Sequence, residues 1–201
     1  MITIGITGIS GSGKTAASAM LAEMGGFVVE ADPLAHALMK KNGAAYDEII
    51  KAFGTEILDE EKEIHRPALG ALVFDDGDKL RQLEGIIHPK VIEETAELIS
   101  GATKTGKYKF AVIDAPLLIE AGMHRNCNST WLITANHEIR LARIITRDNI
   151  SKEAAEKRLA SRKGDEALIP HADVIIENNG SLPELERNIT QALKTINVIL
   201  H

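Results

Sequence analysis

The stretch GISGSGKT, residues 8–15, follows directly on the short apolar run MITIGIT and precedes an alanine-rich segment. Three glycines in eight residues forfeit side-chain packing, so something at this position requires a bare backbone. The pattern Gly8-x-x-x-x-Gly13-Lys14-Thr15 is typical of a phosphate-binding loop, in which backbone N–H groups surround phosphate oxygens. The strand pattern of residues 1–7 and the helix pattern of residues 14–24 supply the context that such a loop requires.

We therefore predict that one continuous segment binds the phosphates of ATP: Gly8, Ile9, Ser10, Gly11, Ser12, Gly13, Lys14, Thr15 and Ala16. Lys14 would place its charge on the β- and γ-phosphates, and the Thr15 hydroxyl would bind Mg²⁺. The loop by itself fits a GTPase, an ATPase or a kinase. The chain has no Asn-Lys-x-Asp guanine motif and is short for a motor ATPase, which favours a small kinase.

Composition limits the other classes of protein. The 201 residues fit one domain with room for an inserted lobe, and they include 44% apolar and 26% charged residues. Only 3% are aromatic and the net charge is −6, which argues against a nucleic-acid partner. Cys127 is the one cysteine, so no internal disulfide forms. Because no apolar run approaches the ~20 residues of a membrane span, we expect a cytoplasmic protein without a membrane partner.

Alternating strand and helix patterns predict an α/β fold with a parallel sheet, as in the P-loop nucleoside triphosphate hydrolase-like kinases. The expected strands are residues 1–7, 27–29, 109–114, 129–134 and 172–176. The expected helices are residues 14–24, 33–41, 44–53, 66–74, 76–87, 89–100, 137–147, 152–162 and one that begins at a Ser181–Glu184 capping box. We expect one kinase domain: a core of residues 1–32, 105–136 and 165–201, a helical acceptor lobe at about 33–104, and a lid at about 137–164.

Two strand ends carry carboxylates. In an open parallel sheet ligands bind outside these ends, so Glu30 and Asp32 should lie near the phosphate loop, with Asp32 as a candidate catalytic base. Asp32-Pro33 equally fits a plain helix start, with Asp32 as the N-cap. Asp114 ends a buried strand and is a possible Mg²⁺ ligand or, alternatively, the cap of the next turn.

A basic segment from Glu138 to Lys163 carries eight Lys and Arg residues against four acids. Arg140, Arg143 and Arg147 share one helix face by spacing. We predict that Arg143 and Arg147 are catalytic lid residues that stabilise the transferring phosphoryl group. The alternative is a solvated helix face.

Taken in order, several segments resemble the dephospho-coenzyme A kinase family over nearly the full length: ITGISGSGKT (6–15), EADPLAH (30–36), FGTEIL (53–58), HRPALGALVF (65–74), LEGIIHPKV (83–91), DAPLLIEAG (114–122), RD (147–148) and ADVIIENNG (172–180). The resemblance implies transfer of the ATP γ-phosphate to the ribose 3′-hydroxyl of dephospho-coenzyme A. This reaction is the last step of coenzyme A biosynthesis.

The resemblance also implies roles for individual residues. It makes Asp32 the base and puts Asn178, Asn179 and Gly180 near the adenine. It puts five residues on the acceptor side: Arg66, His88, Pro89, Leu117 and Glu120. From the residues alone, His88-Pro89 is also a plain helix start. The chain departs from the family pattern at Glu30, His36, His65 and Ser161, which leaves open a kinase with a different acceptor. A nucleotide-binding regulatory module is a third interpretation, disfavoured because Lys14, Thr15, Asp32 and the arginines occur together.

Overall fold

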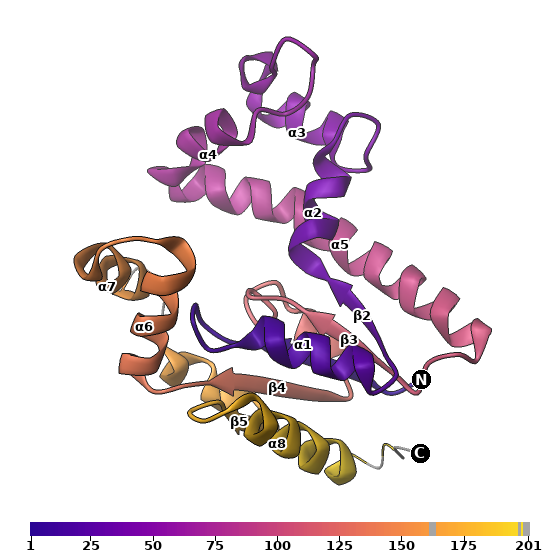
Figure 1. The fold of residues 1–201 in the computed structure, drawn as a ribbon. Coiled ribbons are helices and arrows are strands. Elements are labelled where there is room, and N and C mark those ends of the chain that lie inside the picture. Colours follow the sequence, from indigo (N-terminus) through magenta and orange to yellow (C-terminus); the bar gives the residue numbers. More distant parts are fainter. Residues whose placement is uncertain (161–163, 197, 199–201) are drawn as a thin grey trace. The chain divides into compact units, whose positions relative to one another are not determined.

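The computed structural model describes residues 1–160, 164–196 and 198. The chain forms two compact units, one of residues 1–29 with 101–201 and one of residues 30–100 (Figure 1). No helix in the described part of the chain is long and apolar enough to cross a membrane.

The first unit is built on a five-stranded sheet in the order β2-β3-β1-β4-β5. Its strands are β1 (Thr3–Thr7), β2 (Gly26–Glu30), β3 (Phe110–Asp114), β4 (Ser129–Thr134) and β5 (Val174–Glu177). β1 pairs in parallel with both β3 and β4, and β4 pairs in parallel with β5. Because the chain leaves β1 toward one edge of the sheet and later crosses to the other, the crevice at the end of β1 is where such a sheet binds ligands. The predicted fold class is confirmed.

Two helices on one face of this sheet close its core. α1 (Lys14–Glu23) and α8 (Leu182–Thr195) bury Leu21, Leu185 and Ile189 against Ile4, Ile6, Phe110, Val112, Trp131 and Ile133. β1, β3 and nearly all of β4 are buried throughout, which is why their sequences are continuous apolar runs rather than alternating ones. The predicted capping box is confirmed, since the Glu184 carboxylate accepts from Ser181 N at 2.6 Å.

After β4 the chain forms α6 (His137–Asp148), α7 (Lys152–Ala160) and two short 3₁₀ turns, η3 (Asp165–Ala167) and η4 (Ile169–His171). α6 and α7 pack on each other through Leu141, Ile144 and Ala155, which form a small apolar cluster of their own. The helix predicted over 152–162 is described only to Ala160, and residues 161 and 162 lie outside the described residues.

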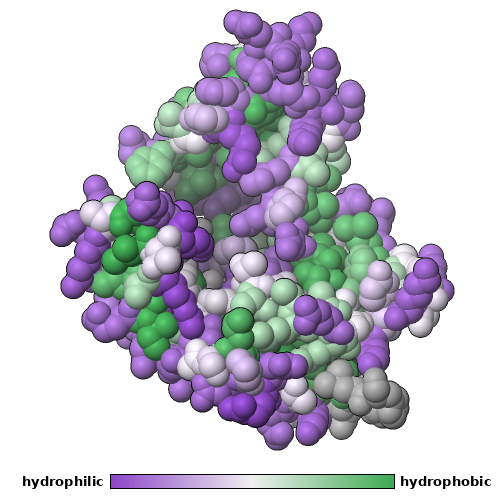
Figure 2. All heavy atoms as spheres, in the orientation of Figure 1, coloured by the Kyte–Doolittle hydropathy of each residue, from purple (hydrophilic) through white to green (hydrophobic). Residues whose placement is uncertain are grey.

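The second unit is helical, with α2 (Ala31–Met39), α3 (Tyr46–Phe53), η1 (Thr55–Ile57), α4 (Arg66–Phe74) and most of α5 (Gly77–Thr105). Leu38, Ile49, Phe53, Ile57 and Leu69 are among its buried apolar side chains. The surface of this unit around α3 is hydrophilic on the face seen in Figure 2, in keeping with the acidic residues exposed there.

Two expectations about this unit were wrong. Residues 77–105 form one helix with Pro89 inside it, not two helices, so His88-Pro89 is not a helix start. An internal proline costs about 3 kcal/mol, and burial of Val91, Thr95 and Ala102 beyond it favours continuing the helix. In addition, α2 begins at Ala31 rather than at residue 33 and has Glu30 at the N-cap, so the alternative interpretation of Asp32 as the N-cap is also wrong.

Candidate active site

Two elements approach the phosphate loop closely, and a glycine marks each approach. A Cβ on Gly8 would lie 2.4 Å from the backbone oxygen of Ile133 in β4. A Cβ on Gly11 would lie 2.7 Å from the backbone oxygen of Arg140 in α6. Gly11 and Gly13 also have φ of 80° and 91°, which side chains disfavour. The bare backbone is therefore needed by the protein's own packing, in addition to any phosphate.

Lys14 is the first residue of α1, and its ammonium group contacts the Asp114 carboxylate at the end of β3. The two side chains are only 15% and 7% exposed, so this is a largely buried ion pair. In the sheet register Asp114 pairs with Ile6, two residues before the loop begins. The sequence predicted both residues for this site, and the structure brings them together.

Thr15 and Asp114 offer hydroxyl and carboxylate oxygens, the donors that Mg²⁺ prefers. Thr15 is exposed at the start of α1, while Asp114 is buried. The described residues contain no group of three or more acidic, His or Cys side chains placed to hold a metal. This donor set fits Mg²⁺ that is held mainly by nucleotide phosphates and water rather than by a protein cage.

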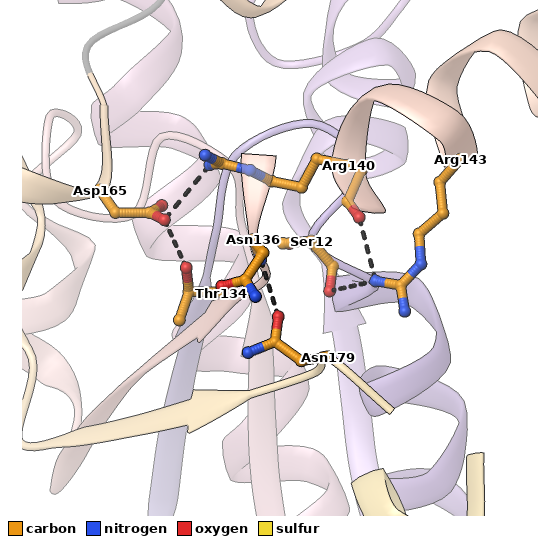
Figure 3. A network of polar contacts seen from close by, with 8 residues as sticks. Ser12, Thr134, Asn136, Arg140, Arg143, Asp165 and Asn179 are labelled. Carbon is orange, nitrogen blue, oxygen red and sulfur yellow. Dashed lines mark hydrogen bonds and ion pairs between the residues drawn. The ribbon is translucent and has the colours of Figure 1, made fainter. Parts of the chain in front are cut away.

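The guanidinium of Arg143, in α6, donates hydrogen bonds to backbone oxygens of the phosphate loop (Figure 3). Its Nη1 donates to the oxygens of Gly11 and Ser12 at 3.2 and 3.3 Å, and its Nη2 donates to the oxygen of Asn178 at 3.0 Å. The Asn178 amide donates to the oxygen of Ser12 at 2.8 Å. Both residues were predicted at the nucleotide, and both contact the loop itself.

Arg147 differs from Arg143. Its guanidinium forms a bidentate ion pair with the neighbouring Asp148, in which Nε and Nη2 donate to the two carboxylate oxygens at 2.7 and 2.9 Å. The Arg147 side chain is 58% exposed. This hydrogen bonding raises the pKa of Arg147 and lowers that of Asp148. Arg158 of α7 donates to the same carboxylate at 2.6 Å. Asp148 therefore ties the end of α6 to α7, and the catalytic role of Arg147 stays a prediction.

Asp165 is a member of this site that the sequence did not indicate. Its carboxylate accepts from Arg140 Nη1 at 3.2 Å and from the hydroxyl of Thr134 (Figure 3). Arg140 and Asp165 are 13% and 17% exposed, and Arg140 Nε and Asp165 Oδ1 are buried without a partner among the described residues. Arg140 is thus anchored to η3 and the end of β4, and no motif in the sequence singled out Asp165, which lies just after the basic segment and next to Glu166.

We expect the Arg140–Asp165 pair to stabilise the position of α6. In a double-mutant cycle of Arg140→Ala and Asp165→Ala, the coupling in the free energy of unfolding should be about 1–2 kcal/mol, because the pair is largely shielded from water. Urea titrations of the four proteins measure it. The exposed Arg81–Asp78 pair is the control and should show no measurable coupling. Equal coupling in the two cycles would contradict this role.

The turn after β5 also touches α6. Asn179 Oδ1 accepts from Asn136 N, just before α6, at 2.7 Å (Figure 3). A Cβ on Gly180 would lie 1.9 Å from Glu184 Oε2, so this glycine makes room for the capping box of α8. The predicted adenine contacts of Asn178 and Gly180 stay predictions.

On the second unit, Asp32, His36 and Arg66 form an electrostatic cluster. Burial and the nearby Arg66 charge lower the pKa of His36, while Asp32 opposes that shift. Asp32 and Arg66 are exposed, and within the described residues the Asp32 carboxylate has no hydrogen-bond or ion-pair partner. The three groups therefore lie close enough for their charges to influence one another.

The other predicted acceptor residues are divided between the two units. His88 and Pro89 lie in α5 of the second unit, half-buried and exposed respectively. Leu117 and Glu120 are exposed on the turns that follow β3 in the first unit. Their contact with an acceptor stays a prediction.

Cys127 is not part of this chemistry. Burial raises the pKa of its thiol to about 12, and its sulfur lies 3.5 Å from the backbone oxygen of Met123. A Cβ on Gly5 would lie 2.7 Å from the same sulfur, so the thiol packs against β1 as a small apolar group.

Comparison with known proteins identifies the family. The dephospho-CoA kinase family model matches residues 2–184. A dephospho-CoA kinase from Fusobacterium nucleatum is 40% identical over 196 residues, which cover 98% of this chain and 99% of that protein. One from Corynebacterium glutamicum is 33% identical over 98% of this chain and the whole of that protein.

Solved structures agree with this assignment. Dephospho-CoA kinase from Campylobacter jejuni superposes with a TM-score of 0.69 at 28% identity, over 96% of both chains. Shikimate kinase from Acinetobacter baumannii has a TM-score of 0.52 at 17% identity, over 99% of this chain and 96% of that one, and shares the fold alone. The chain has a phosphate loop whose lysine pairs with a strand-end aspartate, and it has a helical second unit. Together with these full-length matches, these features show that the chain belongs to the dephospho-CoA kinase family.

Proposed function

We propose that this dephospho-CoA kinase carries out its reaction with the residues assembled here: it binds MgATP on residues 8–16 and transfers the γ-phosphoryl group to the ribose 3′-hydroxyl of dephospho-CoA. The observation that carries the assignment is the loop itself. Arg143 and Asn178 hold its backbone through hydrogen bonds, and the Lys14–Asp114 pair lies next to it. Such an arrangement supports phosphoryl transfer because this chemistry depends on positioning and charge rather than on covalent catalysis.

At the ATP end, the free N–H groups of the first turn of α1 would bind phosphate oxygens, helped by the positive end of the helix dipole. Lys14 would turn from Asp114 to the β- and γ-phosphates. Asp114 and Thr15 would then face Mg²⁺, which neutralises phosphate charge when bound. In this proposal Lys14 leaves Asp114 when the nucleotide binds, and Asp114 then becomes free to face the metal.

At the acceptor end, Asp32 would accept a hydrogen bond from the 3′-hydroxyl and take its proton as the phosphoryl group transfers. Arg66 would supply charge to the phosphates of dephospho-CoA, with His88, Pro89, Leu117 and Glu120 lining the site. Asp32 is suited to this role because its carboxylate is exposed and unpaired within the described part of the chain. Departures from the family pattern at Glu30, His36 and His65 would act on acceptor affinity. The fourth departure, Ser161, lies outside the described residues.

The residue assignments at the acceptor end are tested by acceptor choice. The protein is incubated with MgATP and, in parallel, with dephospho-CoA, nucleosides and nucleoside monophosphates, and the products are identified by mass spectrometry. We expect CoA and ADP from dephospho-CoA, with Arg66→Ala raising the KM for this acceptor. Preferential phosphorylation of a nucleoside or nucleotide would show that the departures have shifted the acceptor, and ATP consumption with no acceptor would refute the site.

Lid arginines should act on turnover more than on acceptor binding. Arg143→Ala is expected to lower kcat at saturating ATP by ~10- to 100-fold, with a smaller change in the acceptor KM, because it removes a positive charge beside the phosphate loop and the donors that hold the Gly11 and Ser12 oxygens. Arg147→Ala tests the second predicted lid residue in the same assay. Arg187→Ala, on the exposed face of α8, is the control and should match wild type. Normal kcat in both lid variants would mean that Arg143 and Arg147 serve the fold and take no part in phosphoryl transfer.

A further inference from the structure

Asn178 is buried in a turn whose other residues are exposed. It directly follows β5 and is 4% exposed, whereas Glu177, Asn179 and Gly180 are exposed. An amide side chain is rarely buried unless its donors and acceptors are satisfied, so its partners indicate its purpose.

All the partners of Asn178 lie on the phosphate loop and the elements that hold it. Its Nδ2 donates to the oxygen of Ser12 at 2.8 Å. Its own oxygen and Oδ1 accept from Arg143 Nη2 at 3.0 and 3.4 Å, and its N–H donates to the oxygen of Thr134 at 2.8 Å. A Cβ on Gly13 would lie 2.0 Å from Nδ2, so Gly13 is what admits the amide to this position.

The contact with Ser12 fixes more than one atom. A trans peptide unit is planar, and its C=O and N–H point in opposite directions. Because Asn178 holds the oxygen of Ser12, the N–H of Gly13 in the same peptide unit points to the opposite side, away from Asn178. That N–H has no acceptor among the described residues, as expected of a donor kept for a phosphate oxygen.

We propose that Asn178 is a positioning residue of the phosphate loop: it orients the Ser12–Gly13 peptide toward the phosphates and does not read the adenine base. The proposal rests on the function given above to residues 8–16 as the ATP phosphate site. It also gives Arg143 a shared task, because the same guanidinium holds the Gly11 and Ser12 oxygens and the backbone of Asn178.

The two roles make opposite predictions for ligands that lack either the base or the phosphates. If Asn178 positions the loop, its substitution weakens the binding of inorganic tripolyphosphate and of ADP alike and leaves the binding of adenosine unchanged. If Asn178 contacts the base, its substitution weakens the binding of adenosine and ADP and leaves the binding of tripolyphosphate unchanged. If Asn178 is merely structural, its substitution lowers the melting temperature and leaves all three binding constants unchanged at temperatures where the protein is folded.

The test is Asn178→Ala, with Kd measured by calorimetry for ADP and tripolyphosphate and by competition for adenosine. We expect both phosphate ligands to bind about 10-fold more weakly, since the Ser12 oxygen loses the shorter of its two hydrogen bonds. Adenosine should bind as it does to wild type. Unchanged affinity for both phosphate ligands, or a loss confined to ADP and adenosine, overturns the proposal.

Two further variants guard against a misfolded protein. Asn178→Asp keeps the size and the acceptor toward Arg143 but sets an oxygen against the Ser12 oxygen, so it should lose more phosphate affinity than Asn178→Ala, on the order of 100-fold. Asn188→Ala is the matched control, because Asn188 donates to the oxygen of Glu177 at 3.1 Å without touching the loop. It should bind all three ligands normally. Failure of the wild-type protein to bind ADP would instead refute the proposed function.

Discussion

Asp32→Asn is expected to fold with near-normal thermal stability, to bind ATP normally and to lose ~10²–10⁴-fold in kcat, the range that general-base assistance contributes. Asn keeps the size of the side chain and removes only its charge and basicity. Asp32 is the second residue of α2 and does not cap it, so the fold loses at most a helix-dipole interaction of about 1 kcal/mol. The measurements are steady-state kinetics with both substrates, ATP binding and a thermal melt.

A matched control separates the helix from the chemistry. Asp47 is the second residue of α3, is also exposed, and lies in the same unit. Asp47→Asn should shift the melting temperature as much as Asp32→Asn does and leave kcat unchanged. If Asp32→Asn turns over like wild type, Asp32 is not the base, and Glu30 becomes the nearest carboxylate to examine.

Lys14→Ala is expected to lower kcat by ~10³-fold or more, because it removes the charge assigned to the β- and γ-phosphates. It should also destabilise the fold, although alanine is well tolerated in a helix. Loss of Lys14 leaves the Asp114 carboxylate buried without its cation, which typically costs about 3–5 kcal/mol. Activity assays and urea unfolding measure the two effects separately.

The double variant Lys14→Ala with Asp114→Asn resolves the two effects. A neutral amide at position 114 no longer needs the cation, so most of the lost stability should return while activity remains absent. Recovery of activity together with stability would mean that Lys14 serves the fold rather than the phosphates. Lys14→Ala with turnover within a few fold of wild type would refute the assignment of the loop.

The sequence by itself determined the parts of this protein that depend on neighbouring residues. The glycine loop, the strand before it and the helix after it lie in one continuous stretch, and a buried parallel strand is a short apolar run that needs no partner to be recognised. The Ser181–Glu184 capping box and the bounds of α4 are local for the same reason. Ordered motifs along the chain also sufficed to indicate the family.

Only the tertiary structure decided what depends on distant partners. Pro89 predicts a helix boundary locally, yet burial of the residues beyond it supports one continuous helix. Asn178 meets Ser12 across 166 residues of chain, and Asp165 meets Thr134 across 31. An asparagine or aspartate in a turn carries no sequence signal of whether it will cap, face solvent or hold a loop. That outcome is set by which carbonyls and cations the sheet order brings against it, because a buried polar group must be paired wherever the fold places it.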